Sequence, residues 1–150
     1  MISNVETAEG LKVAAAASIP AITISHKSFA SREDFDGAID AALTDANIDI
    51  ICEAGFMRIH SDGFVRKWQG RMLNIHPSLL PAFKGIRVHQ QVLDAGVRVS
   101  GCTVHFVVPE LDSGPIIAQA AVPVFPTDTV ETLQSRVLAE EHRLYPAALK

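Results

Sequence analysis

The sequence predicts an α/β fold built around a mainly parallel sheet. Short apolar runs alternate along its 150 residues with segments whose apolar side chains recur every three or four positions. The first pattern is typical of buried strands, and the second of helices that pack on a sheet. Since 48% of the residues are hydrophobic, the chain can form an ordered core. Its length is that of one domain, so we expect residues 1–150 to form a single domain.

The first half of the chain predicts three strands and three helices. Residues 1–4 end a strand, and the alanine-rich residues 6–18 are helical until Pro20 stops the helix. Ser31 has the form of a helix N-cap, and an apolar stripe follows it. That stripe consists of Phe35, Ile39 and Leu43; further strands are expected at residues 21–25 and 48–52, and a short helix at 63–68.

The second half predicts three more strands and two helices. Residues 71–75 form a strand, and residues 88–93 form a helix that Gly96 ends. Residues 97–108 and 116–124 are long and β-branched, and the turn-forming residues 111–115 between them predict adjacent strands. An amphipathic last helix contains Val130, Leu133, Val137 and Leu138, with Asp128 or Thr129 as its cap.

Composition restricts the partners that the protein can have. The net charge of −4 gives no basic footprint, so we expect no nucleic acid partner. No apolar run approaches the roughly 18 residues of a membrane span, and no secretory leader is recognisable, which favours a cytoplasmic protein. Cys52 and Cys102 lie in apolar stretches and are expected to be buried free thiols. Local positive charge for an anionic ligand could come from Arg32, Arg58, Lys84 and Arg87.

Polar residues at the end of one predicted strand could carry chemistry. Asn74 and His76 are two residues apart, so they share a face at the carboxyl end of a strand, where α/β proteins bind ligands. An amide donor beside an imidazole suits stabilising an oxyanion and moving a proton. On spacing alone, however, the structural interpretation is favoured, in which Asn74 caps a turn and His76 is a hydrogen-bonded loop residue.

Two further residues allow a structural and a functional interpretation. Asp112 lies in a Ser-Gly-Pro turn, and a turn alone explains it; a functional Asp112 would face His76 and help to move a proton. His105 lies in an apolar strand, where a histidine is more often structural. The chain lacks a Gly-x-Ser-x-Gly elbow, an intact Gly-x-Gly-x-x-Gly loop and paired metal-ligand spacing, so we expect no metal.

Four motifs resemble, in order, those of phosphoribosylglycinamide formyltransferases (glycinamide ribonucleotide transformylases). They are GFMRI at residues 55–59, NIHPSLLP at 74–81 with FKG at 83–85, GCTVHFV at 101–107, and LDSGPII at 111–117. The last helix is also similar, through Arg136, Glu141 and Tyr145. The similarity covers nearly the whole chain and reverses the structural interpretation of Asn74, His76 and Asp112.

The resemblance implies a Rossmann-like fold and transfer of a formyl group from 10-formyltetrahydrofolate to the amine of glycinamide ribonucleotide. The implied partners are therefore small molecules, without a metal, and the protein would be a monomer or a homodimer. The implied catalytic residues are Asn74, His76 and Asp112, with His105 in support. Those implied to bind the folate are Arg32, Met57, Arg58, Ile59, His60, Asn74, Val108, Pro109, Glu110, Leu111 and Asp112. Those implied to contact the ribonucleotide are Leu138, Ala139, Glu140 and Glu141.

The sequence also departs from the family's pattern. The family opens with a strand and a glycine-rich phosphate loop, so we expect this to be an N-terminally truncated domain without its first βα unit, which keeps folate binding and binds the ribonucleotide poorly. Glu53 stands where an apolar residue is usual, and His60 where leucine is common. The alternatives are a formyltetrahydrofolate hydrolase, against which Pro77 argues, and an inactive folate-binding fragment. Methionyl-tRNA formyltransferase fits less well because its extra basic domain is absent.

Overall fold

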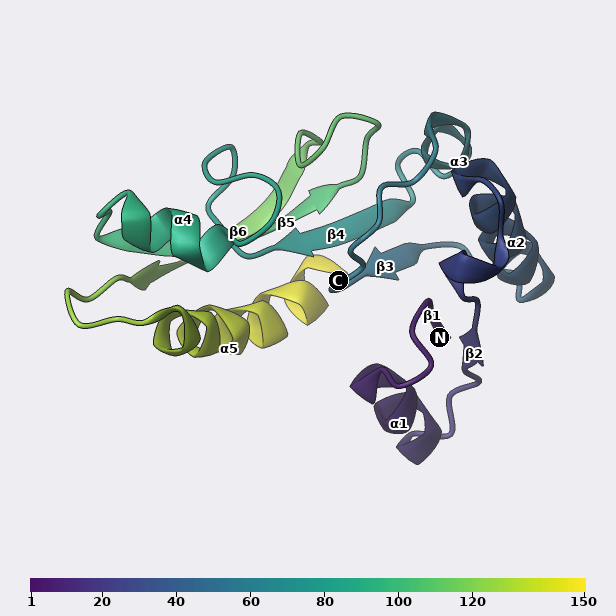
Figure 1. The fold of residues 1–150 in the computed structure, drawn as a ribbon, viewed down its shortest axis with the longest axis horizontal. Coiled ribbons are helices and arrows are strands. Elements are labelled where there is room, and N and C mark those ends of the chain that lie inside the picture. The colour runs from purple at the N-terminus through teal and green to yellow at the C-terminus, as the bar shows by residue number, and fades with distance from the viewer. The chain divides into compact units, whose positions relative to one another are not determined.

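The chain forms two compact units. The structure, a computed structural model, describes residues 1–150. One unit contains residues 1–49 and 60–67, and the other contains residues 50–59 and 68–150. Each unit has its own sheet, of two strands in the first and four in the second (Figure 1). None of the helices combines the length and the apolar character that a membrane crossing requires.

The first unit contains a small parallel sheet and three α-helices. Ser31 caps the longest of these helices, because its hydroxyl accepts a hydrogen bond from the backbone N–H of Asp34 at 3.0 Å. Phe35 and Ile39 of the predicted stripe are buried, as expected. The elements are β1 (Ile2–Ser3), α1 (Glu9–Ala16), β2 (Ile22–Thr23), the 3-10 helix η1 (His26–Ser28), α2 (Arg32–Asp45) and α3 (Asp62–Lys67).

The second unit is a four-stranded sheet with two helices. Its strands follow the order β3-β4-β5-β6, and only β3 and β4 are parallel. The α/β class is confirmed, but strand pairing is mixed rather than mainly parallel. Residues 107–115 join β5 to β6 by a turn, and so short a connection allows only an antiparallel pair. The elements are β3 (Ile51–Glu53), β4 (Met72–His76), α4 (Val88–Asp94), β5 (Val99–Phe106), β6 (Ile116–Pro123) and α5 (Val130–Ala148).

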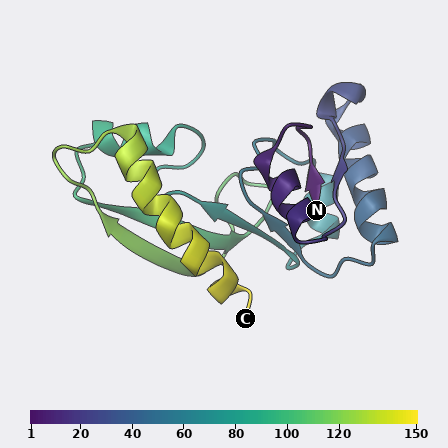
Figure 2. The ribbon, with the colours of Figure 1, turned by 90° about the horizontal axis from the view of Figure 1, so that it is seen from below.

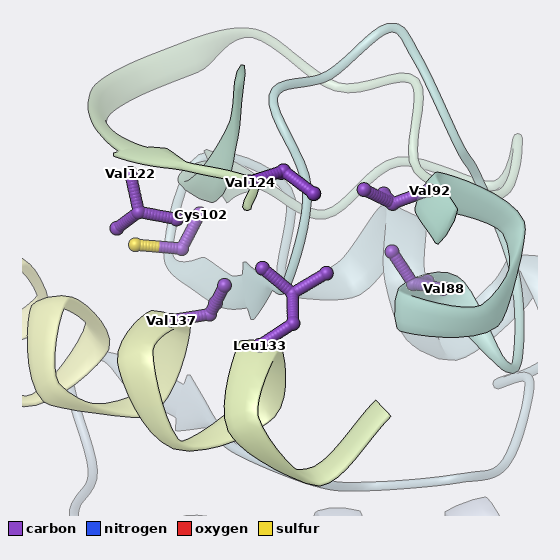
Figure 3. Close-up of a cluster of buried hydrophobic side chains, with 7 residues drawn as sticks. All are labelled: Val88, Val92, Cys102, Val122, Val124, Leu133 and Val137. Carbon is purple, nitrogen blue, oxygen red and sulfur yellow. The ribbon is translucent and has the colours of Figure 1, made fainter. Parts of the chain in front are cut away.

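The core of the second unit lies between α5, α4 and one face of the sheet. Helix α5 crosses the strands in Figure 2, and it begins at a capping box in which Thr129 and Thr132 bond each other's backbone N–H groups. Leu133 and Val137 point from α5 toward the sheet (Figure 3). The buried cluster consists of Val88, Val92, Cys102, Val122, Val124, Leu133 and Val137. At the other end of α5, the Tyr145 hydroxyl bonds the backbone oxygens of Glu53 and Leu73 at 2.8 and 3.0 Å.

Both cysteines are free thiols, as composition predicts. Cys102 is fully buried, and burial together with the nearby Glu141 charge raises its pKa to about 11. A thiol with so high a pKa stays protonated and unreactive near neutral pH. Cys52 is exposed on the edge strand β3, so the expectation of burial is wrong for this residue. A three-residue strand at the edge of a sheet leaves part of its side chains in solvent.

Truncating the most central side chain of α5 tests this packing. Leu133 has 0% exposure, so Leu133→Ala leaves a cavity beneath the helix and is expected to reduce the free energy of unfolding by about 2–5 kcal/mol. Urea denaturation measures the loss. Leu138→Ala is the control, because that side chain is 43% exposed on the same helix and should change stability little. Equal effects of the two substitutions would contradict the packing described here.

Candidate active site

Two adjacent strands bring the polar residues together on the face of the sheet away from α5. Asn74 pairs directly with His105, and His76 pairs with Thr103, in the antiparallel register of β4 and β5. Directly paired residues share a face, so all four side chains lie on the same side. Cys102 and Val104 alternate with them and face the opposite side, where Cys102 contributes to the core. Strand alternation thus separates the polar site from the core.

Asp112 approaches His76 from the turn between β5 and β6. Its Oδ2 lies 3.5 Å from His76 Nδ1, and the two side chains are only 7% and 6% exposed. Asp112 has a φ of 48°, in the left-handed region that aspartate tolerates better than most residues. The turn packs closely on the end of β5, because a Cβ at Gly114 would lie 1.8 Å from the backbone oxygen of Phe106. Only glycine at residue 114 permits this return of the chain.

His105 turns its Nε2 atom toward Asp112. Its Nδ1 lies 2.9 Å from the backbone oxygen of Phe106, which can only accept, so Nδ1 carries the proton in the neutral ring. Its Nε2 is buried without a hydrogen-bond partner and lies 4.0 Å from Asp112 Oδ1. A buried polar atom without a partner is costly unless a ligand or water serves it. His76, His105 and Asp112 therefore converge, as the functional interpretation requires.

Backbone groups of a neighbouring loop hold both His76 and Asp112. The backbone oxygen of Phe83 lies 2.9 Å from His76 Nε2, and the Gly85 N–H donates to Asp112 Oδ2 at 2.8 Å. Sequence reasoning did not find these contacts, since backbone groups leave no signature in side-chain identity. The FKG motif at residues 83–85 was the only available signal.

A buried threonine fixes the segment that leaves β4. The Thr103 hydroxyl donates to the backbone oxygen of Ser78 at 2.7 Å and accepts from the Leu80 N–H at 3.0 Å. Gln119 of β6 donates to that same hydroxyl and to the backbone oxygen of Leu80. Thr103 was not among the predicted site residues, although a hydroxyl two positions before His105 in an apolar strand was a visible signal.

The segments expected to bind the folate expose apolar side chains. Met57, Ile59 and Leu111 are 75%, 56% and 53% exposed, and apolar side chains in solvent suit contact with a flat ligand. Arg58 and Glu110 are also exposed, whereas Val108 and Pro109 are partly buried. Arg32 and His60 belong to the first compact unit. Their contribution to the site stays a prediction.

His60 is buried in the first unit with a carboxylate partner. Its Nδ1 lies 2.7 Å from Asp36 Oδ1, and its ring stacks on Phe64 with centroids 4.4 Å apart. The other oxygen of Asp36 accepts from the Ser61 N–H at 2.6 Å. Burial alone would raise the pKa of Asp36, but the hydrogen bonds from His60 and Ser61 outweigh it and lower that pKa. Asp36 thus supplies the partner that allows His60 to be buried.

Of the residues expected to contact the ribonucleotide, Glu141 is the one whose pKa responds to the charge of His76. Burial raises the pKa of Glu141, and the positive charges of His142 and His76 oppose this rise. Glu140 forms an ion pair with Arg143 at 2.8 Å, while Leu138 and Ala139 are exposed. Glu53, the other departure from the family's pattern, is partly buried in β3.

Comparison with known proteins identifies close relatives. Residues 1–149 match the family model described as formyl transferase. The chain is 43% identical over 149 residues to phosphoribosylglycinamide formyltransferase of Escherichia coli, covering 99% of this chain and 70% of that protein. It is 57% identical over 150 residues to the trifunctional purine biosynthetic protein adenosine-3 of Gallus gallus, covering all of this chain and 15% of that protein.

A solved structure is also very similar. Glycinamide ribonucleotide transformylase 1 from Symbiobacterium toebii superposes with a TM-score of 0.96 at 48% identity. The match covers 98% of this chain and 69% of that one. The chain therefore spans about 15% of the trifunctional relatives and about 70% of the bacterial ones.

The Asp36–His60 pair predicts an acid-sensitive contribution to stability. Because the folded pKa of Asp36 lies below its unfolded value of about 3.9, its contribution is fully present above that pH and is lost as the pH falls through the lower folded value. Asp36→Asn should reduce the free energy of unfolding by about 1–3 kcal/mol at pH 7 and by progressively less at pH 4 and below. Urea denaturation across pH measures this difference.

Asp45→Asn is the matched control, since Asp45 is an exposed residue at the end of the same helix. A stability difference between native protein and Asp36→Asn that stayed constant from pH 7 to pH 2 would contradict the role given to Asp36.

Proposed function

The chain belongs to the formyl transferase family, and we propose that it transfers a formyl group from 10-formyltetrahydrofolate to the primary amine of glycinamide ribonucleotide. The names of its relatives support this choice of acceptor, because they include phosphoribosylglycinamide formyltransferases. The structural observation that carries the proposal is the 3.5 Å approach of Asp112 to His76 beside the unpartnered Nε2 of His105. The cluster contains the groups that acyl transfer to an amine requires.

Asn74 and His76 stabilise the charge that develops during transfer. When the amine nitrogen attacks the formyl carbon, negative charge builds on the formyl oxygen. Asn74 and His76 lie on one face of β4. The Asn74 amide can donate to that oxygen, and so can Nδ1–H of the His76 imidazolium, since the Phe83 carbonyl engages only Nε2. Each such donor is typically worth about 3–4 kcal/mol of transition-state stabilisation. His76 and Asp112 are both nearly buried, which strengthens these electrostatic effects.

Asp112 moves the proton that the reaction must transfer. A new C–N bond forms between the amine nitrogen and the formyl carbon, and the bond from that carbon to the folate nitrogen N10 breaks. The amine nitrogen loses one proton and N10 gains one. Asp112 can relay this proton directly or through a water that also contacts His105 Nε2. The formyl group and this proton are the only groups exchanged between the two substrates.

Binding is assigned to exposed segments of the second unit. The folate lies against residues 57–59 and 108–112, where Met57, Ile59 and Leu111 supply apolar contact. Glu141 of α5 is assigned to contact the ribonucleotide away from the reacting amine, and burial raises its pKa. Participation of Arg32 and His60, a cytoplasmic location, and a monomeric or homodimeric state remain predictions from the sequence.

An acceptor-dependence assay tests the proposed reaction. The protein is mixed with 10-formyltetrahydrofolate, and release of tetrahydrofolate is followed with and without glycinamide ribonucleotide. We expect release only when the ribonucleotide is present. Release without it would instead identify a hydrolase, and no release under either condition would contradict an enzymatic function for this chain.

Substituting His76 tests the mechanism. Because His76 is proposed to act on the transition state, His76→Ala should lower kcat by roughly 10²–10⁴-fold and leave the Kd for the folate nearly unchanged. Steady-state kinetics and equilibrium fluorescence titration with the folate measure the two quantities. A kcat equal to that of the native protein would remove His76 from the mechanism.

A further inference from the structure

The loop formed by residues 83–86 contacts both acid–base groups of the proposed site. Its first residue, Phe83, accepts from His76 Nε2 at 2.9 Å through its backbone oxygen. Two positions later, the Gly85 N–H donates to Asp112 Oδ2 at 2.8 Å. Since a carbonyl can only accept, the Phe83 contact fixes the proton of His76 on Nε2 and turns Nδ1 toward Asp112. The position of this loop therefore sets the orientation of both side chains.

The loop does not hold its own conformation through backbone pairing. No backbone–backbone hydrogen bond involves residues 83–86. Phe83 and Gly85 have φ values of 55° and 80°, and Arg87, immediately after the loop, has 53°. Left-handed backbone at a bulky residue such as Phe83 persists only when the surroundings enforce it. Phe83 packs against the core cluster, and the rest of the loop needs a constraint of its own.

A side chain of α4 supplies this constraint. The Gln91 amide donates to the backbone oxygen of Lys84 at 3.1 Å and to that of Ile86 at 2.8 Å. A primary amide carries two hydrogens, so both bonds form at once. The two acceptors lie on either side of Gly85, whose N–H holds Asp112. A second contact, from Lys84 Nζ to the Ser113 hydroxyl at 2.5 Å, joins the loop to the turn that carries Asp112.

We propose that Gln91 is a positioning residue for the formyl transfer assigned above. Its amide holds the 83–86 loop so that Phe83 and Gly85 orient His76 and Asp112. Gln91 does not contact the reacting atoms in this scheme, and it acts through two backbone carbonyls. The inference rests on the proposed function only for its effect on turnover, because the orientation of His76 can be measured without it.

The structure offers a matched pair of glutamines for the test. Gln90 precedes Gln91 on α4, is exposed, and donates to Asp94 on its own helix at 2.7 Å. Methionine has nearly the length of glutamine and is a good helix former, but it lacks the amide donors. Gln91→Met therefore removes the two bonds to the loop, and Gln90→Met removes an amide of the same kind that does not contact it. Gln91→Glu keeps the shape and replaces the donor by an acceptor.

Turnover is the first measurement. Displacing reacting groups by about 1 Å can cost on the order of 10²-fold, so Gln91→Met and Gln91→Glu should lower kcat by about 10- to 100-fold. The KM for both substrates and the melting temperature should change little, and Gln90→Met should match the native protein. A residue that only fills space would tolerate both substitutions at residue 91 and show no such separation of kcat from KM.

The second measurement is independent of activity. In protein labelled with 15N-histidine, the Nε2 resonance of His76 is identified by its loss in His76→Ala. It should shift in Gln91→Met, as the Phe83 carbonyl moves away, and stay in place in Gln90→Met. If the native chain lacks transferase activity, the proposed function fails, while this resonance still decides whether Gln91 orients His76. An unshifted resonance in Gln91→Met, or an unchanged kcat in an active enzyme, overturns the inference.

Discussion

The approach of Asp112 to His76 is the interaction on which the rest of the site depends. The two groups come from different parts of the chain, a strand end and a turn, and meet at 3.5 Å. Both are nearly buried, so each needs partners that compensate for lost water. The 83–86 loop supplies them from its backbone, as an acceptor for the imidazole and a donor for the carboxylate. The proposed catalytic pair and its supporting loop are therefore joined by hydrogen bonds.

Local patterns predicted the elements of the fold well. Ser31 and Thr129 begin their helices as expected, and each predicted strand is present, although the strand at residues 21–25 shortens to Ile22–Thr23. Strand direction was harder to predict, because periodicity reports which face is buried and not which neighbour a strand pairs with. The turn at residues 111–115 is the available signal for an antiparallel pair, and its prediction that β5 and β6 are adjacent is confirmed.

The site was predictable in its residues and less so in its supports. Spacing placed Asn74 and His76 on one face, while their association with Asp112 came from family resemblance, because turn residues carry no information on what they approach. Thr103, Phe83 and Gln91 were missed for a related reason. Each contact has a backbone carbonyl on one side, and a carbonyl is present at every residue, so side-chain identity does not reveal it. Asp36 was likewise missed as the partner that allows His60 to be buried.

The register between β4 and β5 has a consequence for how the chain can change. His105 and Val104 are neighbours in sequence and both are buried, but they face opposite sides of the sheet: His105 faces the polar cluster and Val104 the side covered by α5. One extra residue inserted into this strand would exchange the two faces, turning an imidazole toward the helix-covered core and a valine toward the polar cluster. A substitution here therefore alters one face at a time, whereas an insertion or deletion would disturb the core and the proposed site together.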